Sequence, residues 1–259
     1  SKIDCFKINQ GMKDPALLEQ VKNLAPDLFI VVGWYHMTPS SFMRIAPSYG
    51  LHASLLPDYS GGAPLVWAII NGEKKTGITL FQMAQGVDNG PIIGQLSTMI
   101  SSEDTIASLY DRIESLGLKL LKEQLPRIID GSTKLIIQDE KQRRVFPQRG
   151  PEDGEINWSL PAKKVYDFIR AQTKPYPGAF SLHRKDKVTI WASQIVESSI
   201  SRSLGQAQIK TLNQRIFVGC GEGSSLEILQ IAINEKDISV DKWFHEKIAT
   251  GTIHEFSSN

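Results

Sequence analysis

The sequence predicts an α/β domain followed by a smaller domain made mostly of β-strands. Short, wholly apolar runs alternate with helix-like segments over the first 150 residues, which is typical of a Rossmann-like, mostly parallel sheet. A stretch rich in proline, glycine and charge follows at 143–158. Beyond it, short alternating segments separated by turn residues predict a small β barrel or sandwich.

The first domain begins with a well-marked helix. Asp14-Pro15 supplies an N-cap residue and a proline at the first helical position, ahead of apolar residues at helical spacing that end before Pro26. DLFIVVGW (27–34) then predicts a strand buried on both faces. The later predicted elements are a strand at 49–56, a buried helix at 64–71, strands at 76–83 and 91–100, and a long amphipathic helix within 101–131.

The second domain begins with a helix-like segment at 162–173 and the turn KPYPGAF. Its predicted strands lie at 187–196, 205–210, 214–221 and 225–233, and a helix near 240–248 follows them. We therefore expect an α/β domain at 1–150, and a linker helix with a small C-terminal β domain at 151–259.

Composition excludes several classes of function. Lysine plus arginine against aspartate plus glutamate is 16 against 15 up to Gly150 and 13 against 13 beyond it, so neither half is a basic nucleic-acid module by bulk charge. The two cysteines and five histidines show no metal-ligand spacing, which predicts no metal site. No apolar run is long enough to span a bilayer and no signal peptide is visible, so we expect no membrane partner and a cytoplasmic protein with reduced thiols.

Two loops that follow predicted strands carry titratable groups, His52 in HASLLPDYSGG and Asp88 in GVDNGP. Ligands of open α/β sheets bind beyond the carboxyl ends of the strands, and histidine transfers protons near neutral pH. A histidine at a strand end is also commonly structural, and an aspartate before Asn-Gly is commonly a turn residue. From spacing alone both interpretations stay open. Motifs of serine hydrolases, P-loop NTPases and dinucleotide enzymes are absent from the sequence.

The ordered run HASLLP–Y–G–AP–W–I–NGE–TGITLFQM–GVD–G resembles the 10-formyltetrahydrofolate-dependent N-formyltransferases. Within them, it is most similar to the methionyl-tRNA formyltransferases and to the formyltransferases of nucleotide-linked amino sugars. PEDGEINW, AKKVYDFIRA and PYPGAF resemble the join between the family's two domains, and VGCGEGSSLEILQI resembles its C-terminal β domain. The resemblance therefore covers most of the chain. It implies a catalytic domain at 1–150, and a linker helix with an OB-like C-terminal β domain at 151–259.

The resemblance implies formyl transfer from 10-formyltetrahydrofolate to a primary amine. His52 and Asp88 stand at the family's catalytic histidine and aspartate, so His52 is expected to take the proton of the attacking amine or to stabilise the oxyanion, with Asp88 orienting and charging it. The family has asparagine two positions before the histidine, where this chain has Gly50. Three outcomes follow: a water or backbone N–H replaces the amide, another residue such as Asn89 supplies it, or the chain is an inactive folate- or nucleotide-sugar-binding homologue.

The resemblance also implies a folate site after the VVGW strand and along the segment that leads to Asp88. The expected folate-binding residues are Gly33, Trp34, Tyr35, Met83, Gly86, Val87 and Asp88. The expected acceptor-binding residues are Ser54, Leu55, Leu56 and Gly61. Trp34 is equally well interpreted as a buried aromatic at a strand end, and the two leucines as loop packing.

The acceptor is expected to be small. The family's tRNA enzymes carry a basic residue after SLLP, where this chain has Asp58, which favours a nucleotide-linked amino sugar over methionyl-tRNA. The basic cluster Lys141, Arg143, Arg144 and Arg149 fits a solvated linker, and as a site it would suit a diphosphate or a tRNA stem. A formyltetrahydrofolate hydrolase is a further alternative. From the resemblance we also expect the chain to lack the family's first βα unit or units, and the sequence does not indicate the oligomeric state.

Overall fold

The computed structural model describes residues 5, 12–34, 36–196, 204–212, 215–247 and 254–257. Their contacts divide the chain into two compact units. The first unit comprises 1–62, 77–98 and 113–146, and the second comprises 63–76, 99–112 and 147–259. No described helix is long and apolar enough to cross a membrane.

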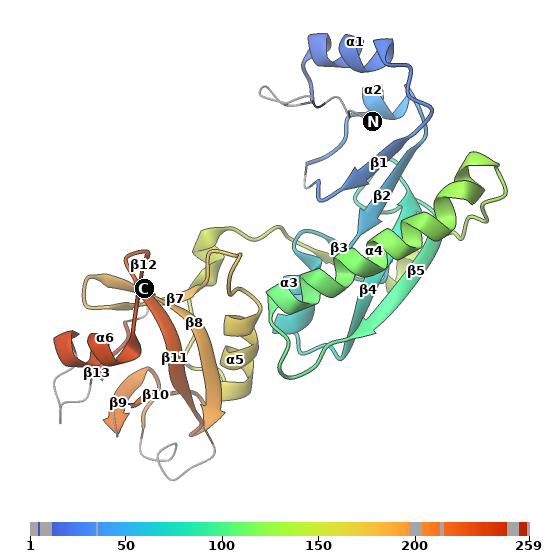
Figure 1. The fold of residues 1–259 in the computed structure, drawn as a ribbon. Helices are drawn as coiled ribbons and strands as arrows, with labels where there is room; N and C mark the ends of the chain where they lie inside the picture. The colour runs from blue at the N-terminus through green and yellow to red at the C-terminus, as the bar shows by residue number, and fades with distance from the viewer. Residues whose placement is uncertain are drawn as a thin grey trace. The chain divides into compact units, whose positions relative to one another are not determined.

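A mixed sheet in the order β1-β2-β4-β5 forms the framework of the first unit (Figure 1). Its strands are β1 (Phe29–Val32), β2 (Ser48–His52), β4 (Lys75–Gln82) and β5 (Ile92–Met99). β1 runs parallel to β2, whereas β4 runs antiparallel to β2. The mostly parallel character expected from the sequence therefore applies to the β1–β2 pair and stops at β4.

The helices of the N-terminal half follow the sequence signals closely. They are α1 (Pro15–Asn23), α2 (Ser40–Met43), α3 (Pro64–Ile70) and α4 (Ile106–Ile129). Asp14 caps α1 by accepting a hydrogen bond from Ala16 N at 2.9 Å, as the sequence predicts. α4 crosses β4 and β5 in Figure 1, and glycine permits a close approach there: a methyl group at Gly117 would lie 3.2 Å from Ile78 Cδ1.

Short elements connect the last part of the first unit to the segment after β2. β3 (Ser60–Gly61) pairs in parallel with β6 (Val145–Phe146). Two 3₁₀ turns flank β6, η1 (Glu140–Gln142) and η2 (Pro151–Gly154). The β3–β6 pair lets a segment 85 positions further along the chain hold the residues just after the SLLP loop, because Ser60 pairs with Val145.

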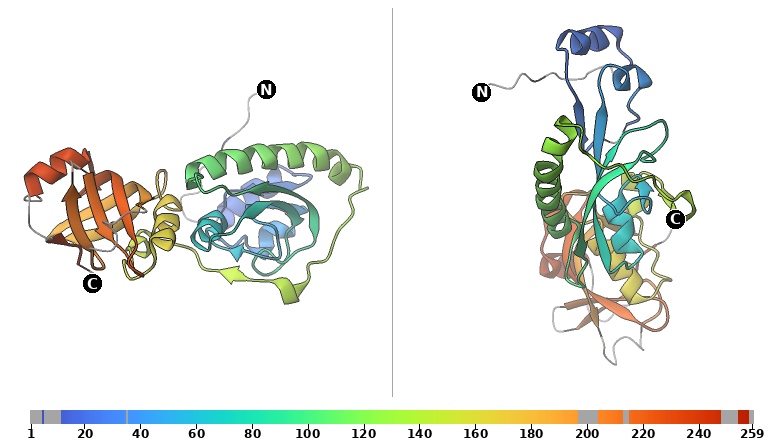
Figure 2. Two further views of the ribbon diagram at one scale, coloured as in Figure 1. Left: turned by 90° about the horizontal axis from the view of Figure 1, so that it is seen from below. Right: turned by 90° about the vertical axis from the view of Figure 1, so that its right-hand side faces the viewer.

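The C-terminal half contains an antiparallel sheet in the order β13-β9-β10-β11-β8-β7, with β12 paired to β11. Its strands are β7 (Ala179–His183), β8 (Asp186–Val196), β9 (Gln208–Leu212), β10 (Arg215–Gly219), β11 (Ser225–Ile233), β12 (Lys236–Ile238) and β13 (His254–Glu255). The orange and red strands curve around a shared interior in Figure 2. We call this sheet with its helices α5 (Ala162–Arg170) and α6 (Val240–Lys247) the C-terminal barrel.

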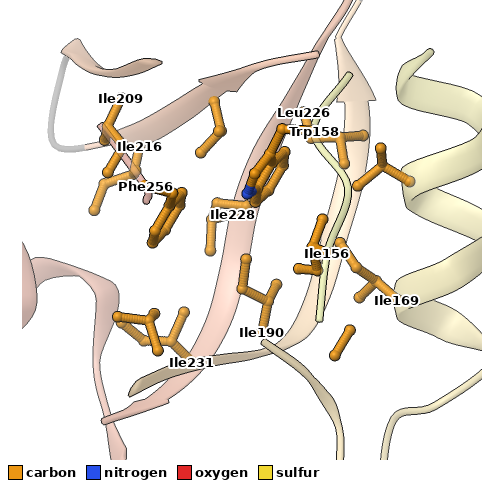
Figure 3. Packing of buried hydrophobic residues seen from close by; sticks show 14 of the residues in the cluster. Ile156, Trp158, Ile169, Ile190, Ile209, Ile216, Leu226, Ile228, Ile231 and Phe256 are labelled. Atoms are coloured by element: carbon orange, nitrogen blue, oxygen red, sulfur yellow. The ribbon is translucent and has the colours of Figure 1, made fainter. Parts of the chain in front are cut away.

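One hydrophobic cluster fills the C-terminal barrel (Figure 3). Isoleucines from several strands are fully buried in it, and α5 contributes Ile169 from outside the sheet. Trp158 stacks on Phe256, with ring centroids 5.4 Å apart and planes within 3°. Apolar side chains that alternate along the strands thus meet in a single core, which confirms the predicted β domain.

Both parts of the predicted fold class are confirmed, the α/β domain and the barrel-like β domain. The functional division at residue 150 and the expected absence of the family's first βα unit stay predictions.

Candidate active site

His52 and Asp88 meet at one place in the first unit, although not by the route that the sequence suggested. His52 is the last residue of β2 and pairs with Thr79 of β4. Because β4 runs antiparallel to β2, the end of β4 lies beside the start of β2, where Met83 N donates to Ser48 O at 2.8 Å. The 83–91 loop therefore turns back to bring Asp88 to His52.

The imidazole of His52 lies between two acceptors. Nε2 is 2.8 Å from the backbone oxygen of Tyr59, and Nδ1 is 3.6 Å from Oδ2 of Asp88. A carbonyl oxygen can only accept, so Nε2 carries the proton in the first contact. The second distance exceeds that of a direct hydrogen bond but brings the carboxylate close enough to stabilise positive charge on the ring. The side chains are 11% and 22% exposed, so both are partly accessible to solvent.

Backbone and side-chain amides hold Asp88 in place. Its Oδ2 accepts a hydrogen bond from Gly61 N at 2.8 Å, and its backbone adopts the left-handed conformation (φ 49°). The buried Gln138 donates from Nε2 to the carbonyls of Asp88 and Gly90, at 2.8 and 2.6 Å. Arg143 donates to the carbonyl of Val87. These contacts fix both the carboxylate and its loop.

The SLLP loop is fastened by polar groups of the neighbouring strands. Thr79 donates from its hydroxyl to Ser54 O at 2.7 Å and accepts from Leu56 N at 3.1 Å. Gln95 donates to Leu56 O at 2.9 Å. Ser54 in turn donates from its hydroxyl to Asp58 O at 2.7 Å. Thr79 and Gln95 were missed by sequence reasoning, although a threonine buried within an apolar strand is a signal that could have found the first.

The residues after the SLLP loop contact the basic segment at 141–149. The guanidinium of Arg144 forms two hydrogen bonds with the carboxylate of Asp58, Nε to Oδ1 and Nη2 to Oδ2, each at 2.6 Å. Arg149 donates from Nη2 to Asp153 O and to the Gln172 side chain, at 2.5 and 2.9 Å. These arginines thus make contacts within the protein, and Asp58 is paired with a cation rather than presented as a lone negative charge.

Gly50 has no room for a side chain. A Cβ at this position would lie 2.7 Å from Cε1 of Phe81, its partner across β2 and β4. Phe81 is buried together with Leu56 and Ile92, and Met83 packs against them. The phenylalanine ring thus occupies the space beside β2 into which a residue at 50 would point.

The expected folate-binding residues lie on two loops. Gly33 (φ 62°) and Trp34 follow β1, and since β1 is parallel to β2 they lie at the same edge of the sheet as His52. Trp34 is 38% exposed and meets His36 edge-on, so it is not the buried aromatic of the alternative interpretation. Tyr35 lies outside the described residues.

The second loop holds Met83, Gly86 and Val87. Gly86 (φ 116°) and Val87 are exposed, whereas Met83 is partly buried. Of the expected acceptor residues, Ser54 and Leu56 are buried in loop packing, while Leu55 and Gly61 are partly exposed. The structure therefore joins Ser54, Gly61 and Asp88 to the surroundings of His52. The roles of all the expected site residues stay predictions.

Grooves elsewhere do not coincide with this site. One of about 610 Å³ lies in the second unit and includes Trp191 and Arg215 in its lining, and one of about 530 Å³ lies between α1 and α2. Within the described residues, no cluster of histidine, cysteine and carboxylate side chains has the composition of a metal site.

Comparison of the sequence with protein-family models assigns the chain to a family. The formyl transferase model matches residues 6–125, and the formyl transferase C-terminal domain model matches residues 149–247. The chain belongs to the formyl transferase family. His52, Asp88 and the β2–β4 framework all lie within the first match.

Solved structures of formyltransferases and of larger proteins share the fold. HypX from Aquifex aeolicus in complex with tetrahydrofolic acid has a TM-score of 0.71 and 18% identity, with 95% of this chain and 45% of HypX covered. The N-formyltransferase from Helicobacter canadensis in complex with folinic acid and dTDP-3-aminofucose has a TM-score of 0.60 and 23% identity, with 72% of this chain and 68% of the enzyme covered. Methionyl-tRNA formyltransferase from Clostridium thermocellum has a TM-score of 0.57 and 23% identity, with 82% of each chain covered. The chain thus spans less than half the length of HypX.

Proposed function

We propose that this formyltransferase chain transfers the formyl group of 10-formyltetrahydrofolate to a primary amine, with His52 and Asp88 as catalytic residues. The observation that carries the proposal is the His52–Asp88 pair, 3.6 Å apart, inside the part of the chain that matches the formyl transferase model. In the reaction the amine nitrogen forms a bond to the formyl carbon, the bond from that carbon to N10 breaks, and the amine proton ends on N10. The reaction therefore needs a base that takes this proton from the amine and returns it to N10.

His52 has the contacts required of such a base. The Tyr59 carbonyl keeps the ring proton on Nε2, which leaves the lone pair of Nδ1 to accept the amine proton. Once the ring is charged, the carboxylate of Asp88 at 3.6 Å stabilises the imidazolium. Asp88 stays oriented because its Oδ2, the oxygen nearest the His52 ring, also accepts a hydrogen bond from Gly61 N–H.

The oxyanion must be stabilised without a side chain at position 50. Gly50 and Phe81 together leave no space for an amide there. The charged ring of His52 and a bound water then supply the stabilising charge and hydrogen bond, at some cost in rate, since losing one such donor typically costs about 10²–10³ in turnover. The alternative, an inactive folate- or nucleotide-sugar-binding homologue, is favoured by the same glycine.

The formyl donor fits the two loops that sequence comparison selected. Trp34 presents an exposed aromatic face at the same sheet edge as His52, suited to a planar ring system. The exposed backbone of Gly86 offers hydrogen-bonding groups close to Asp88 in the chain, and the exposed side chain of Val87 offers an apolar contact. The complexes of HypX with tetrahydrofolic acid and of the H. canadensis enzyme with folinic acid support a reduced folate as the donor. Residues 1–150 would then form the catalytic domain and 151–259 the C-terminal domain.

For the acceptor we propose a nucleotide-linked amino sugar. Charge is nearly balanced in both halves, and Arg144 and Arg149 are engaged by partners within the protein, which favours a small acceptor over a tRNA backbone. Because Asp58 is neutralised by Arg144, its negative charge alone no longer argues against tRNA. The similarity to the C. thermocellum enzyme keeps methionyl-tRNA as the second acceptor.

A direct assay tests both the proposed formyl transfer and the proposed acceptor. Purified protein is mixed with 10-formyltetrahydrofolate and, in separate reactions, with a panel of nucleotide-linked amino sugars and with charged initiator tRNA, and formylated product is measured by mass spectrometry. Formylation of a sugar supports the proposal. Formylation of tRNA alone overturns the acceptor, folate consumption without any acceptor indicates the hydrolase, and binding without turnover indicates the inactive homologue.

A further inference from the structure

A second set of contacts, outside the proposed catalytic pair, surrounds the loop that both catalytic residues touch. Tyr59 supplies the carbonyl that receives the His52 proton, and Gly61 supplies the N–H that binds Asp88. Only Ser60 separates these two residues in the chain. The position of this three-residue stretch therefore sets the geometry of both catalytic side chains at once.

The backbone conformation of this stretch is not one that its residues favour by themselves. Tyr59 and Gly61 both have positive φ, 54° and 94°, and for tyrosine the left-handed region is unfavourable. Such a backbone persists only where neighbouring structure imposes it. The neighbouring structure here is the β3–β6 pair, in which Ser60 N donates to Arg144 O at 3.0 Å.

Arg144 adds three further contacts to this pair. Its guanidinium binds both carboxylate oxygens of Asp58 at 2.6 Å and lies 4.8 Å from the ring centroid of Tyr59. Asp58 Oδ1 also accepts from Tyr59 N at 2.9 Å, so the ion pair is tied directly to the backbone of Tyr59. The Tyr59 ring is stacked on Phe146, with centroids 4.5 Å apart.

The exposure of the ion pair argues against a purely stabilising role. The side chains of Arg144 and Asp58 are 53% and 35% exposed, and exposed ion pairs contribute little to folding. Two parallel hydrogen bonds from a planar guanidinium do, however, fix direction closely. The arrangement is thus better suited to setting a geometry than to supplying stability.

We propose that Arg144 and Asp58 are positioning residues, which hold Tyr59 and Gly61 so that His52 keeps its proton on Nε2 and Asp88 keeps its orientation. The inference rests on the proposed function, since it assigns a role within the same site. Replacing Arg144 by alanine removes the ion pair with Asp58 and removes the cation from the Tyr59 ring. The Tyr59 carbonyl then no longer selects one tautomer of His52.

The test combines a spectroscopic measurement with kinetics. ¹⁵N chemical shifts of the His52 imidazole report which nitrogen carries the proton, whether or not the protein is active. In Arg144→Ala we expect His52 to become a mixture of tautomers and kcat to fall by about 10- to 100-fold, as for other partners that orient a catalytic group, with KM for the folate within about twofold. Arg144→Lys keeps the charge without the planar fork, so it should restore activity only in part.

A matched control separates positioning from loss of an exposed ion pair. Lys119→Ala breaks the exposed pair with Glu123 on α4, far from these contacts in sequence, and should change neither the ¹⁵N shifts nor kcat. Unchanged ¹⁵N shifts in Arg144→Ala, or full activity in that variant, would overturn the inference. If the wild-type protein formylates no amine while Arg144→Ala still alters the His52 tautomer, the proposed function fails and the positioning role stands.

Discussion

The His52–Asp88 site and the C-terminal barrel are held by different kinds of contact. Around His52 the contacts are directional hydrogen bonds, and several residues there, including Tyr59 and Asp88, have left-handed backbone. In the barrel, side chains such as Ile190 and Ile216 are fully buried in one apolar cluster. Packing of this kind supplies stability, whereas directional bonds supply geometry. Substitutions in the two regions should therefore change different measurable quantities.

Removing His52, the proposed catalytic base, should give the largest effect and should leave the fold intact. His52→Ala is expected to lower kcat by about 10²–10⁴, since general base catalysis contributes that much. The free energy of unfolding should change by about 1 kcal/mol at most, because one hydrogen bond to Tyr59 O is lost. Initial rates and urea denaturation measure the two quantities.

His52→Gln is the matched control for this variant. Its side-chain amide can still donate to the Tyr59 carbonyl but cannot take up a proton, so it should be as inactive as alanine and more stable. Wild-type turnover in either variant would remove His52 from the mechanism.

In the C-terminal barrel, substitution of a core residue should mainly lower the free energy of unfolding. Ile190→Ala deletes a fully buried side chain from the cluster and is expected to lower the free energy of unfolding by about 2–5 kcal/mol. Ile195 lies on the same strand β8 but is 41% exposed, so Ile195→Ala should stay within about 0.5 kcal/mol. Equal effects of the two substitutions would mean that burial in this cluster does not determine the stability of the strand.

Asp104 shows that the second unit also contains a carboxylate held by directional bonds. Burial raises the pKa of Asp104, but hydrogen bonds from Arg112, Ser101 N and Ser108 outweigh it and lower the pKa to about 2. Because the folded pKa lies below the unfolded value of 3.8, the carboxylate stabilises the protein above pH 4, and this contribution is lost as the pH falls from about 4 to about 2.

Asp104→Asn should therefore cost about 2 kcal/mol at neutral pH, from the size of the pKa shift. It should also flatten the fall of the unfolding free energy between pH 4 and pH 2, measured by denaturation at each pH. Glu103→Gln alters an exposed neighbouring carboxyl and serves as the control. If both variants keep the wild-type slope, the hydrogen bonds to Asp104 do not carry acid sensitivity.

The elements of the fold were predictable from local pattern because local chemistry determines them. Asp14-Pro15 identified the start of α1, and alternation identified strands such as β8 and β11. The direction of β4 relative to β2 was not predictable, since a wholly apolar strand has the same pattern in either direction. Resemblance, rather than periodicity, selected His52 and Asp88.

The supporting contacts of the site lay beyond sequence reasoning for a different reason. Gln138 and Arg144 reach the site from 50 and 86 positions along the chain, and no spacing rule links residues so far apart. Composition alone groups Arg144 with a basic linker cluster. Its partner Asp58 changed that interpretation, because a paired cation holds a loop where an unpaired one would recruit an anion.

Substitutions at Gly50 test whether side-chain packing also constrains β2, the strand that ends at His52. A methyl group there would meet the edge of the Phe81 ring at 2.7 Å, and Phe81 is itself buried against Leu56 and Ile92. Gly50→Ala should therefore lower the free energy of unfolding by about 1 kcal/mol through overpacking. Adding Phe81→Leu makes room for the methyl group, so the double variant should be more stable than the sum of the single effects predicts. Additive effects in this denaturation cycle would show that Phe81 does not restrict position 50.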